Sequence, residues 1–420
     1  MTIFEERESN VRSYCRSFPD IYKTSVGSII RSECGKEYID FLSGAGALNY
    51  GHNNPYIKRQ VISYLQADGI IHALDMYTPA KRRFLETLTN TILEPKHLDF
   101  KVQFCGPTGT NAVEAALKLA RKVTKRTGVF AFTGAYHGMS LGSLSVSGSL
   151  EGRAGAGVPL ANVSFMPYPF DFMETFDTIG YIESILSDPY AGVEKPAAII
   201  FETTQAEGGV IVAPTQWIRD LRRLCDKHGL LLICDDIQVG CGRTGPFFSF
   251  ERANIIPDMV TLSKSISGYG FPMSLLLMKR DLDVWAPGEH TGTFRGNQLS
   301  LVGATAALEL RRDSDLESSV RDKESFIYSY LQTEIIPIDD RIRIRGIGMI
   351  WGIDLTHCGG ANAAKDITMR CFNCGLIVER VGRNNAVIKI IPPLTTDINV
   401  LQMGCDILKQ SLVDYFNKNL

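Results

Sequence analysis

The sequence predicts an α/β fold in which a mostly parallel sheet of seven strands is covered by helices. Between about residues 100 and 280, short apolar runs alternate with stretches of helical periodicity, as in sheets whose parallel strands are joined by helices. The helical pattern is clearest in residues 110–122 and 217–228. The expected strands are 101–104, 129–133, 163–166, 197–202, 230–235, 259–263 and 274–278.

The two ends of the chain have a different pattern. Residues 1–50 contain short strand signals and a glycine-bearing turn, and the chain after about residue 303 is more charged. Strand–turn–strand patterns recur near residues 341–354 and 375–390. We therefore expect a large domain of residues 51–302 and a smaller α+β domain formed by residues 1–50 together with residues 303–420.

Composition and charge exclude several classes of protein. The 420 residues are 45% hydrophobic and 21% charged with a net charge of -2, so the chain offers no basic footprint for nucleic acid. The charged N-terminus lacks the apolar segment of a signal peptide, and no apolar run is long enough to cross a bilayer. We expect a cytoplasmic protein with neither a membrane nor a nucleic acid as partner.

The ten cysteines are scattered and do not indicate a metal site. Cys371 and Cys374 form a C-x-x-C pair, but no second pair stands at the spacing of a zinc site. We interpret the pair as packing or surface residues and predict no bound metal.

Five polar segments follow expected strands. In open α/β sheets the ligand crevice lies outside the carboxyl ends of the strands, so these segments should converge there. In the first of them, Thr108, Gly109 and Thr110 lead directly into a helix, whose free N–H groups favour an anion such as phosphate. A plain helix cap is the alternative. The five segments are 106–121, 134–140, 201–209, 230–245 and 260–270.

Two charged residues end strongly apolar strands. Asp235 should be largely desolvated there and needs a cationic partner, either a protonated pyridine nitrogen or an arginine or lysine. Lys264 in a dry site could lose its proton and attack carbonyls, whereas a solvated lysine is the alternative. Tyr136 could stack on a flat ring or close the core, and Glu202 and Glu207 flank a polar turn.

Taken in order, these segments resemble the class III branch of the fold-type I pyridoxal-phosphate aminotransferases. The most specific stretches are D-x-x-Q at 235–238, S-K-S at 263–265 and TFRGN at 293–297, and the resemblance covers most of the chain. It implies pyridoxal 5'-phosphate as cofactor and a Schiff base on Lys264. In relatives, the aspartate that matches Asp235 pairs with the pyridinium nitrogen, and the glutamine that matches Gln238 hydrogen-bonds the phenolic oxygen.

The resemblance also implies further contacts with the cofactor. Tyr136 would stack on the ring with His137 beside it, and residues 108–110 would hold the phosphate. The threonine that matches Thr293 reaches that phosphate from a neighbouring subunit in related enzymes. We therefore expect a homodimer or a dimer of dimers.

The substrate residues depart from the family pattern. In relatives, an acid that matches Glu207 pairs with an arginine to switch between two substrates, but here the partner position is Lys389, which cannot form a bidentate fork. Met139 replaces a carboxylate-binding arginine, for which Arg295 is a possible substitute. Asn49 is a further expected substrate contact. Asp75 could favour a diamine near the substrate entrance, or belong to a solvated loop.

Within the family, several stretches resemble the transaminases that carry an amino group from glutamate to aspartate 4-semialdehyde. The expected ligands are therefore a small amino donor and a semialdehyde acceptor. The alternatives are enzymes for other ω-amino substrates (ornithine, acetylornithine or 4-aminobutyrate), an aminomutase, and a non-catalytic homologue. The stretches are 12–19, 44–55, 106–123, 235–251, 265–270 and 288–297.

Overall fold

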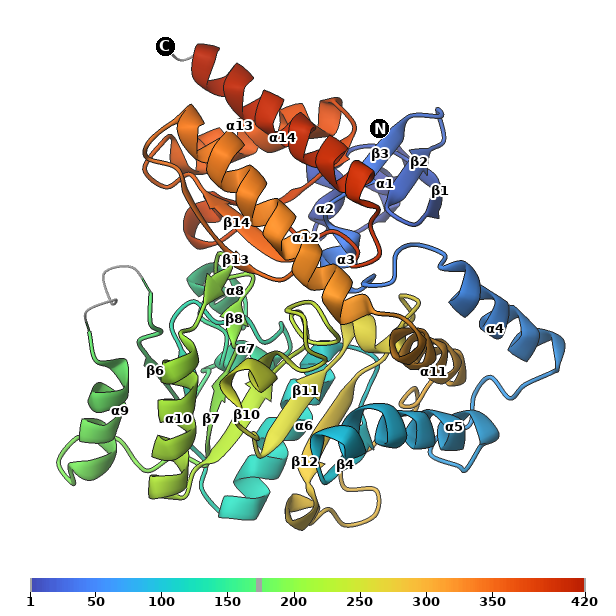
Figure 1. Cartoon of the computed structure of the whole chain (residues 1–420). Helices are drawn as coiled ribbons and strands as arrows, with labels where there is room; N and C mark the ends of the chain where they lie inside the picture. The colour runs from blue at the N-terminus through green and yellow to red at the C-terminus, as the bar shows by residue number, and fades with distance from the viewer. Residues whose placement is uncertain (1, 171–175, 419–420) are drawn as a thin grey trace.

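A seven-stranded sheet forms the centre of the protein, whose computed structural model describes residues 2–170 and 176–418 (Figure 1). Strand β12 runs antiparallel to both of its neighbours, and the other pairings are parallel. The predicted mostly parallel sheet is confirmed, with every strand end within one residue of its expected position. The order is β4 (Phe100–Phe104), β12 (Leu275–Lys279), β11 (Met259–Leu262), β10 (Leu231–Asp235), β7 (Ala198–Phe201), β5 (Val129–Phe132) and β6 (Val163–Met166).

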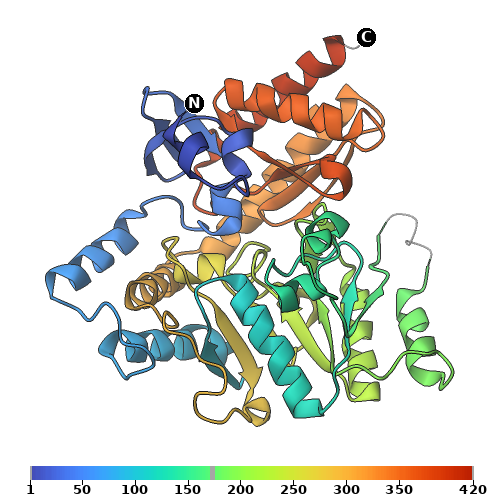
Figure 2. The ribbon, with the colours of Figure 1, turned by 180° about the vertical axis from the view of Figure 1, so that it is seen from behind.

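Helices cover both faces of this sheet. Helix α10 (Thr215–His228) lies over the face seen in Figure 1, and α6 (Gly109–Thr124) lies over the opposite face, seen in Figure 2. Neighbouring residues of a strand point to opposite faces, so Leu232 joins the core under α10 whereas Ile233 joins the core under α6. Strands buried on both faces read as continuous apolar runs, which explains the pattern in the sequence.

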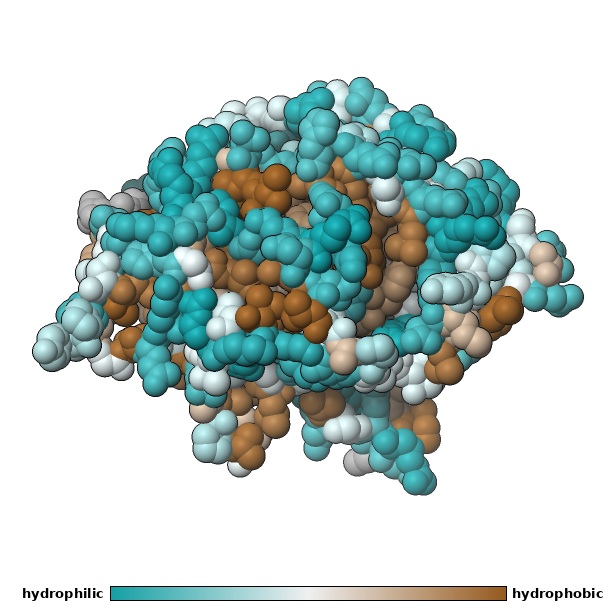
Figure 3. Space-filling model, turned by 90° about the horizontal axis from the view of Figure 1, so that it is seen from below, coloured by the Kyte–Doolittle hydropathy of each residue, from teal (hydrophilic) through white to brown (hydrophobic). Residues whose placement is uncertain are grey.

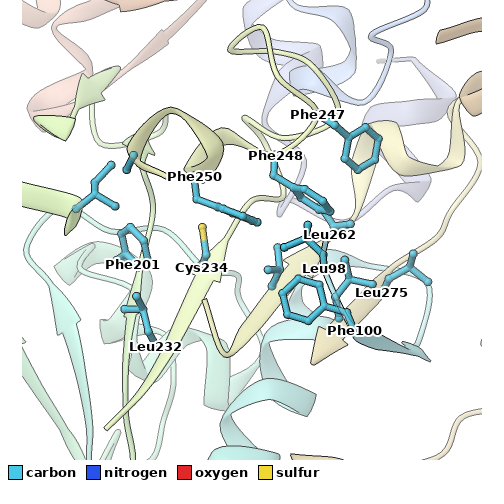
Figure 4. Packing of buried hydrophobic residues seen from close by; sticks show 14 of the residues in the cluster. Leu98, Phe100, Phe201, Leu232, Cys234, Phe247, Phe248, Phe250, Leu262 and Leu275 are labelled. Carbon is cyan, nitrogen blue, oxygen red and sulfur yellow. The ribbon is translucent and has the colours of Figure 1, made fainter. Parts of the chain in front are cut away.

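Aromatic residues pack against the sheet on the α10 side (Figure 4). The rings of Phe248 and Phe250 are stacked with centroids 5.0 Å apart, and both lie near Cys234 and Leu262 of the central strands. These rings belong to the loop and 3-10 helix that follow β10. They pack that segment firmly against the sheet, and so fix the chain that leaves Asp235.

Two small sheets form the second part of the molecule. N-terminal strand β3 pairs in parallel with C-terminal β15, so the two ends of the chain meet as expected. The division at residues 50 and 302 stays a prediction. One sheet has the order β1 (Tyr22–Val26), β2 (Ile29–Ser32), β3 (Glu37–Asp40) and β15 (Leu376–Ile377), and the other has the order β13 (Arg343–Ile347), β14 (Ile350–Asp354), β17 (Val387–Ile390) and β16 (Glu379–Val381).

The remaining elements connect and cover these sheets, and α4 projects from the body (Figure 1). Among the described residues, no helix combines the length and apolarity needed to span a bilayer. The longer helices are α4 (Pro55–Gln66), α5 (Pro79–Leu88), α9 (Thr178–Ser187), α11 (Gln298–Asp313), α12 (Leu316–Tyr330), α13 (Gly360–Asn373) and α14 (Ile398–Lys418). The short elements are α1 (Ile3–Arg7), α2 (Tyr14–Ser17), α3 (Ser43–Gly46), α7 (Leu141–Ser145), α8 (Leu150–Ala154), β8 (Thr204–Gln205) and β9 (Ile211–Val212).

Apolar side chains remain exposed on α4 and along the segment that joins it to α5. The ring of Tyr77 is 99% exposed, and six further apolar residues of this stretch are at least 41% exposed. Viewed from below, brown apolar side chains interrupt the polar surface on the side where α4 projects (Figure 3). The six residues are Ile62, Leu65, Ile70, Ile71, Leu74 and Met76.

Candidate active site

A cavity of about 300 Å³ lies where the parallel strands of the large sheet end. It collects residues from five separate segments, as the crevice rule predicts. Lys389 does not line the cavity, but it contacts Glu207, which does line it. The sequence-predicted residues that line it are Thr108, Gly109, Thr110, Tyr136, His137, Glu207, Asp235, Gln238 and Lys264.

Lys264 follows β11 and opens a turn of 3-10 helix. Its φ of 52° lies in the left-handed region, which residues other than glycine seldom adopt. Residues with such a strained backbone are concentrated at functional sites. Burial lowers the pKa of its ammonium, and the nearby charges of Glu207 and Lys389 oppose each other. A buried amine with a lowered pKa is more easily deprotonated and becomes a better nucleophile and base.

Asp235 is held rigidly at the end of β10. One carboxylate oxygen lies 2.6 Å from Nδ1 of His137, and the other accepts from the Thr261 hydroxyl at 3.0 Å and the Ile237 amide at 3.2 Å. Burial opposes the charged imidazole, but the hydrogen bond and charge of Asp235 outweigh it and raise the pKa of His137. His137 therefore orients Asp235 toward the cavity and is itself held there by the carboxylate.

Glu202 lies beside this pair, immediately after β7. Its side chain is buried, and one oxygen accepts the Tyr136 amide at 3.0 Å. Burial is the main cause that raises the pKa of Glu202 to about 8, and the charge of Asp235 adds to it while His137 opposes it. Near neutral pH this carboxyl therefore keeps its proton.

The N-terminus of α6 forms another side of the cavity. Thr108 caps the helix in a capping box with Asn111, whose side-chain oxygen accepts the Thr108 amide at 3.3 Å and its hydroxyl at 3.0 Å. The amides of Gly109 and Thr110 belong to the first turn, which has no carbonyl partners within the helix. The residues present there suit an anion such as a phosphate.

An ionic cluster extends from Glu207 into the second part of the molecule. The ammonium of Lys389 is fully buried and lies 2.7 Å from Glu207, 2.9 Å from Glu379 and 3.3 Å from the side-chain oxygen of Gln238. Burial opposes its charge, but the two carboxylates outweigh that effect and raise the pKa of Lys389. The Gln238 amide nitrogen is also engaged, since it donates to the Ala45 carbonyl at 2.8 Å.

Three sequence-predicted residues lie elsewhere in this chain. Thr293 is exposed and does not line the cavity. The side chain of Asn49 is buried between the Arg243 guanidinium at 2.6 Å and the Cys241 carbonyl at 3.2 Å, and it does not line the cavity. Arg295 contacts Asp75 in a different hollow, so in this chain it does not replace the missing arginine at Met139.

Glu379 is the site residue that sequence reasoning missed. It stands directly opposite Lys389 in the antiparallel pair β16–β17, so both side chains point to the same face. The strand–turn–strand pattern of 375–390 was visible in the sequence, but the register across its turn was not. Within residues 2–170 and 176–418, no cluster of three potential metal ligands occurs.

Three relatives about 50% identical match nearly the whole chain. A diaminobutyrate–2-oxoglutarate transaminase from Bordetella parapertussis is 50% identical over 416 residues, covering 99% of this chain and 95% of the relative. A protein with the same name from Streptomyces coelicolor is 49% identical over 98% of this chain and 97% of its own length. An uncharacterised aminotransferase from Sinorhizobium fredii is 51% identical over 97% of this chain and 91% of its length.

Solved structures share the fold at lower identity. A transaminase from the marine bacterium Virgibacillus has a TM-score of 0.88 at 19% identity and covers 100% of this chain and 99% of its own. An ornithine aminotransferase from Toxoplasma gondii has a TM-score of 0.86 at 24% identity, covering 99% of this chain and 94% of its own. The family model described as aminotransferase class-III matches residues 13–412, and the chain therefore belongs to the class III aminotransferase family.

Proposed function

We propose that this chain is a pyridoxal-phosphate-dependent transaminase that moves an amino group from L-glutamate to L-aspartate 4-semialdehyde. The products are L-2,4-diaminobutyrate and 2-oxoglutarate. The observation that carries the proposal is that relatives about 50% identical along nearly the whole of both chains bear the name of this activity. The buried amine of Lys264, in one cavity with Asp235 and a free helix N-terminus, supports the cofactor.

The cavity fits a flat phosphorylated ring. A Cβ on Gly109 would lie 2.9 Å from Ile237, and one on Gly138 would lie 2.6 Å from the Thr110 hydroxyl, so only glycine lets these backbones come so close to the anion site. We assign the phosphate to Thr108, Gly109 and Thr110. Asp235 would face the ring nitrogen, and Tyr136 would lie on the ring.

Pyridoxal phosphate supplies an aldehyde that condenses with amines and a protonated ring that withdraws electrons from the substrate carbon. The chain supplies the rest. Asp235, supported by His137, would keep the ring nitrogen protonated. The Lys264 amine would hold the cofactor aldehyde and, when free, take a proton from the substrate carbon, because burial lowers its pKa and so favours the basic form.

Glu207 would govern the substrate. Its side chain is 30% exposed, whereas its partner Lys389 is fully buried. A partly exposed carboxylate that lines the same cavity as the reactive amine is suited to accept the second ammonium group of a diamine. We propose that Glu207 and Lys389 are the residues by which the site distinguishes diaminobutyrate from glutamate.

We also propose a homodimer. The exposed apolar residues of α4 and of the segment that joins it to α5 form a surface that a second copy would cover, and the exposed Thr293 would reach the cavity of the neighbouring copy. Multi-angle light scattering of the cofactor-loaded protein should give the mass of a dimer or of a dimer of dimers. A monomeric mass in an active preparation would contradict this.

The activity is tested with single amines. The cofactor-loaded protein is mixed with diaminobutyrate, glutamate, ornithine or 4-aminobutyrate, and the absorption of the bound cofactor is followed. Diaminobutyrate and glutamate should change the spectrum, and turnover of diaminobutyrate in the reverse direction should require 2-oxoglutarate as amino acceptor, which separates a transaminase from an aminomutase. Changes with ornithine or 4-aminobutyrate but with neither expected amine would refute the assignment.

Lys264→Ala is the matched inactive variant. It should abolish turnover and the spectral change, while circular dichroism and the thermal midpoint stay near those of the wild type, because the side chain faces a cavity rather than the core. Turnover by this variant above about one-thousandth of the wild-type rate would show that Lys264 is not the amine that reacts.

A further inference from the structure

Lys389 has two carboxylate partners instead of one. Its ammonium hydrogen-bonds the side-chain oxygens of Glu207 and Gln238 at 2.7 and 3.3 Å and forms an ion pair with Glu379 at 2.9 Å. A fully buried ammonium needs at least one of these carboxylates, because an uncompensated charge in the interior is strongly destabilising. It does not need both.

The two carboxylates differ in how firmly they are held. Glu379 belongs to strand β16 and is fixed opposite Lys389 by the backbone pairing, with its side chain 9% exposed. Glu207 belongs to a turn that continues into Gly208 and Gly209, and its side chain is 30% exposed. Both acids line a cavity of about 280 Å³ beside the N-terminal segment, but only Glu207 also lines the cavity that contains Lys264.

We propose that Glu379 is the fixed counter-ion of Lys389, that it frees Glu207 to bind a substrate ammonium, and that it thereby sets the preference of the site for a diamino acid over a dicarboxylate. This inference rests on the proposed function. With a single acid, departure of that acid exposes a cation that attracts an incoming carboxylate. With Glu379 in place, Lys389 stays neutralised when Glu207 leaves, and the site has no unpaired positive charge that would bind a substrate carboxylate.

The charges of the cluster support this assignment. With both acids ionised, the three side chains carry a net charge of minus one beside the reactive amine, which attracts ammonium groups and repels carboxylates. Burial, and then repulsion by Glu207, raise the pKa of Glu379, while Lys389 opposes them. When Glu207 turns toward a substrate, that repulsion weakens, which favours the ionised form of Glu379 beside the lysine.

The test is the Glu379→Gln variant, which keeps the shape of the side chain but removes its charge. Rates of the two half-reactions are measured separately in single-turnover experiments with diaminobutyrate and with glutamate. Glu207 becomes the sole counter-ion and is held on Lys389, so the ratio of kcat/KM for diaminobutyrate to that for glutamate should fall by about tenfold. Inhibition by glutarate, which has two carboxylates and no amine, should strengthen by about tenfold, because the cluster has lost one negative charge and a carboxylate that displaces Glu207 now meets an unpaired Lys389.

Glu334→Gln is the matched control. Glu334 also pairs with a lysine in the C-terminal part of the chain, with its carboxylate 2.5 Å from Lys409, but it lies outside both cavities. This control should leave the ratio and the glutarate inhibition unchanged. If Glu379→Gln does not fold, Glu379→Asp, with its carboxylate withdrawn from Lys389 by one methylene, should shift both quantities in the same direction by less.

The outcomes separate this inference from the proposed function. If the wild type does not react with diaminobutyrate, the proposed function fails, and the glutarate measurement still tests Glu379 by itself. If the variant slows both half-reactions equally and leaves glutarate inhibition unchanged, Glu379 only supports the fold and the inference is overturned.

Discussion

Replacing Glu202 by glutamine should stabilise the cofactor-free protein, and increasingly so as the pH rises. The carboxyl of Glu202 is 7% exposed, and burial raises its pKa from 4.5 to about 8. Glutamine has the size and neutrality of the protonated acid, and its oxygen can still accept the Tyr136 amide, which lies 3.0 Å from the glutamate oxygen. The variant is therefore permanently in the neutral form that Glu202 prefers in the folded protein.

The sign of the effect follows from proton binding. Between pH 4.5 and about 8 the folded wild type holds a proton on Glu202 that the unfolded chain has released, so its free energy of unfolding falls as the pH rises through this window. The contribution is complete below pH 4.5 and is lost above about pH 8. A shift of this size corresponds to about 5 kcal/mol at 1.36 kcal/mol per pKa unit, which is an upper bound. Protein interiors screen charge more strongly than a medium of low dielectric constant does. We therefore expect the stability difference between the variant and the wild type to grow by about 2 kcal/mol between pH 5 and pH 8.

Urea unfolding at pH 5, 6.5 and 8 measures this difference at one fixed protein concentration, because association also contributes to stability. Glu251→Gln is the control, since Glu251 is a partly exposed acid that pairs with Lys96. Its difference from the wild type should vary little with pH. A Glu202→Gln variant whose stability relative to the wild type is the same at all three pH values would show that this carboxyl is ionised in the folded protein.

Two further substitutions test the sheet and the anion site. Ile233→Ala, at a fully buried position of the central strand β10, should lower the free energy of unfolding by about 2–5 kcal/mol in urea titrations, and a loss below about 1 kcal/mol would contradict the packing. Gly138→Ala should weaken pyridoxal phosphate binding by about tenfold in spectroscopic titrations, because its Cβ would lie 2.6 Å from the Thr110 hydroxyl; unchanged affinity would argue against a phosphate at this turn.

The parts of the molecule that could be predicted from the sequence depend on neighbouring residues. Each strand of the large sheet is a short apolar run that ends in a polar turn, so both its limits and the residues at its carboxyl end were visible. Asp235 and Lys264 were identifiable because a charge at the end of such a run requires a partner. Once the strands are parallel, their ends lie together without any further information.

The parts that could not be predicted depend on contacts between distant segments. Asn49 stands in a stretch typical of the family, yet its side chain is held by Arg243, 194 residues away, and no local pattern indicates that pairing. Arg243 in turn is fully buried and donates to the carbonyls of Met349 and Pro392. Its three partners come from widely separated segments of the chain, and only the folded structure brings them together.

The lysine at position 389 shows how such contacts change the meaning of a substitution. Judged by sequence alone, replacing an arginine by lysine weakens a carboxylate clamp, because the bidentate fork is lost. In the structure, the compact ammonium hydrogen-bonds Glu207 and Gln238 and forms an ion pair with Glu379, whereas a guanidinium would bring five N–H groups into the same buried space. Glu207 and Glu379 can therefore neutralise a lysine at this position. The presence of Glu379 explains how lysine can replace arginine here.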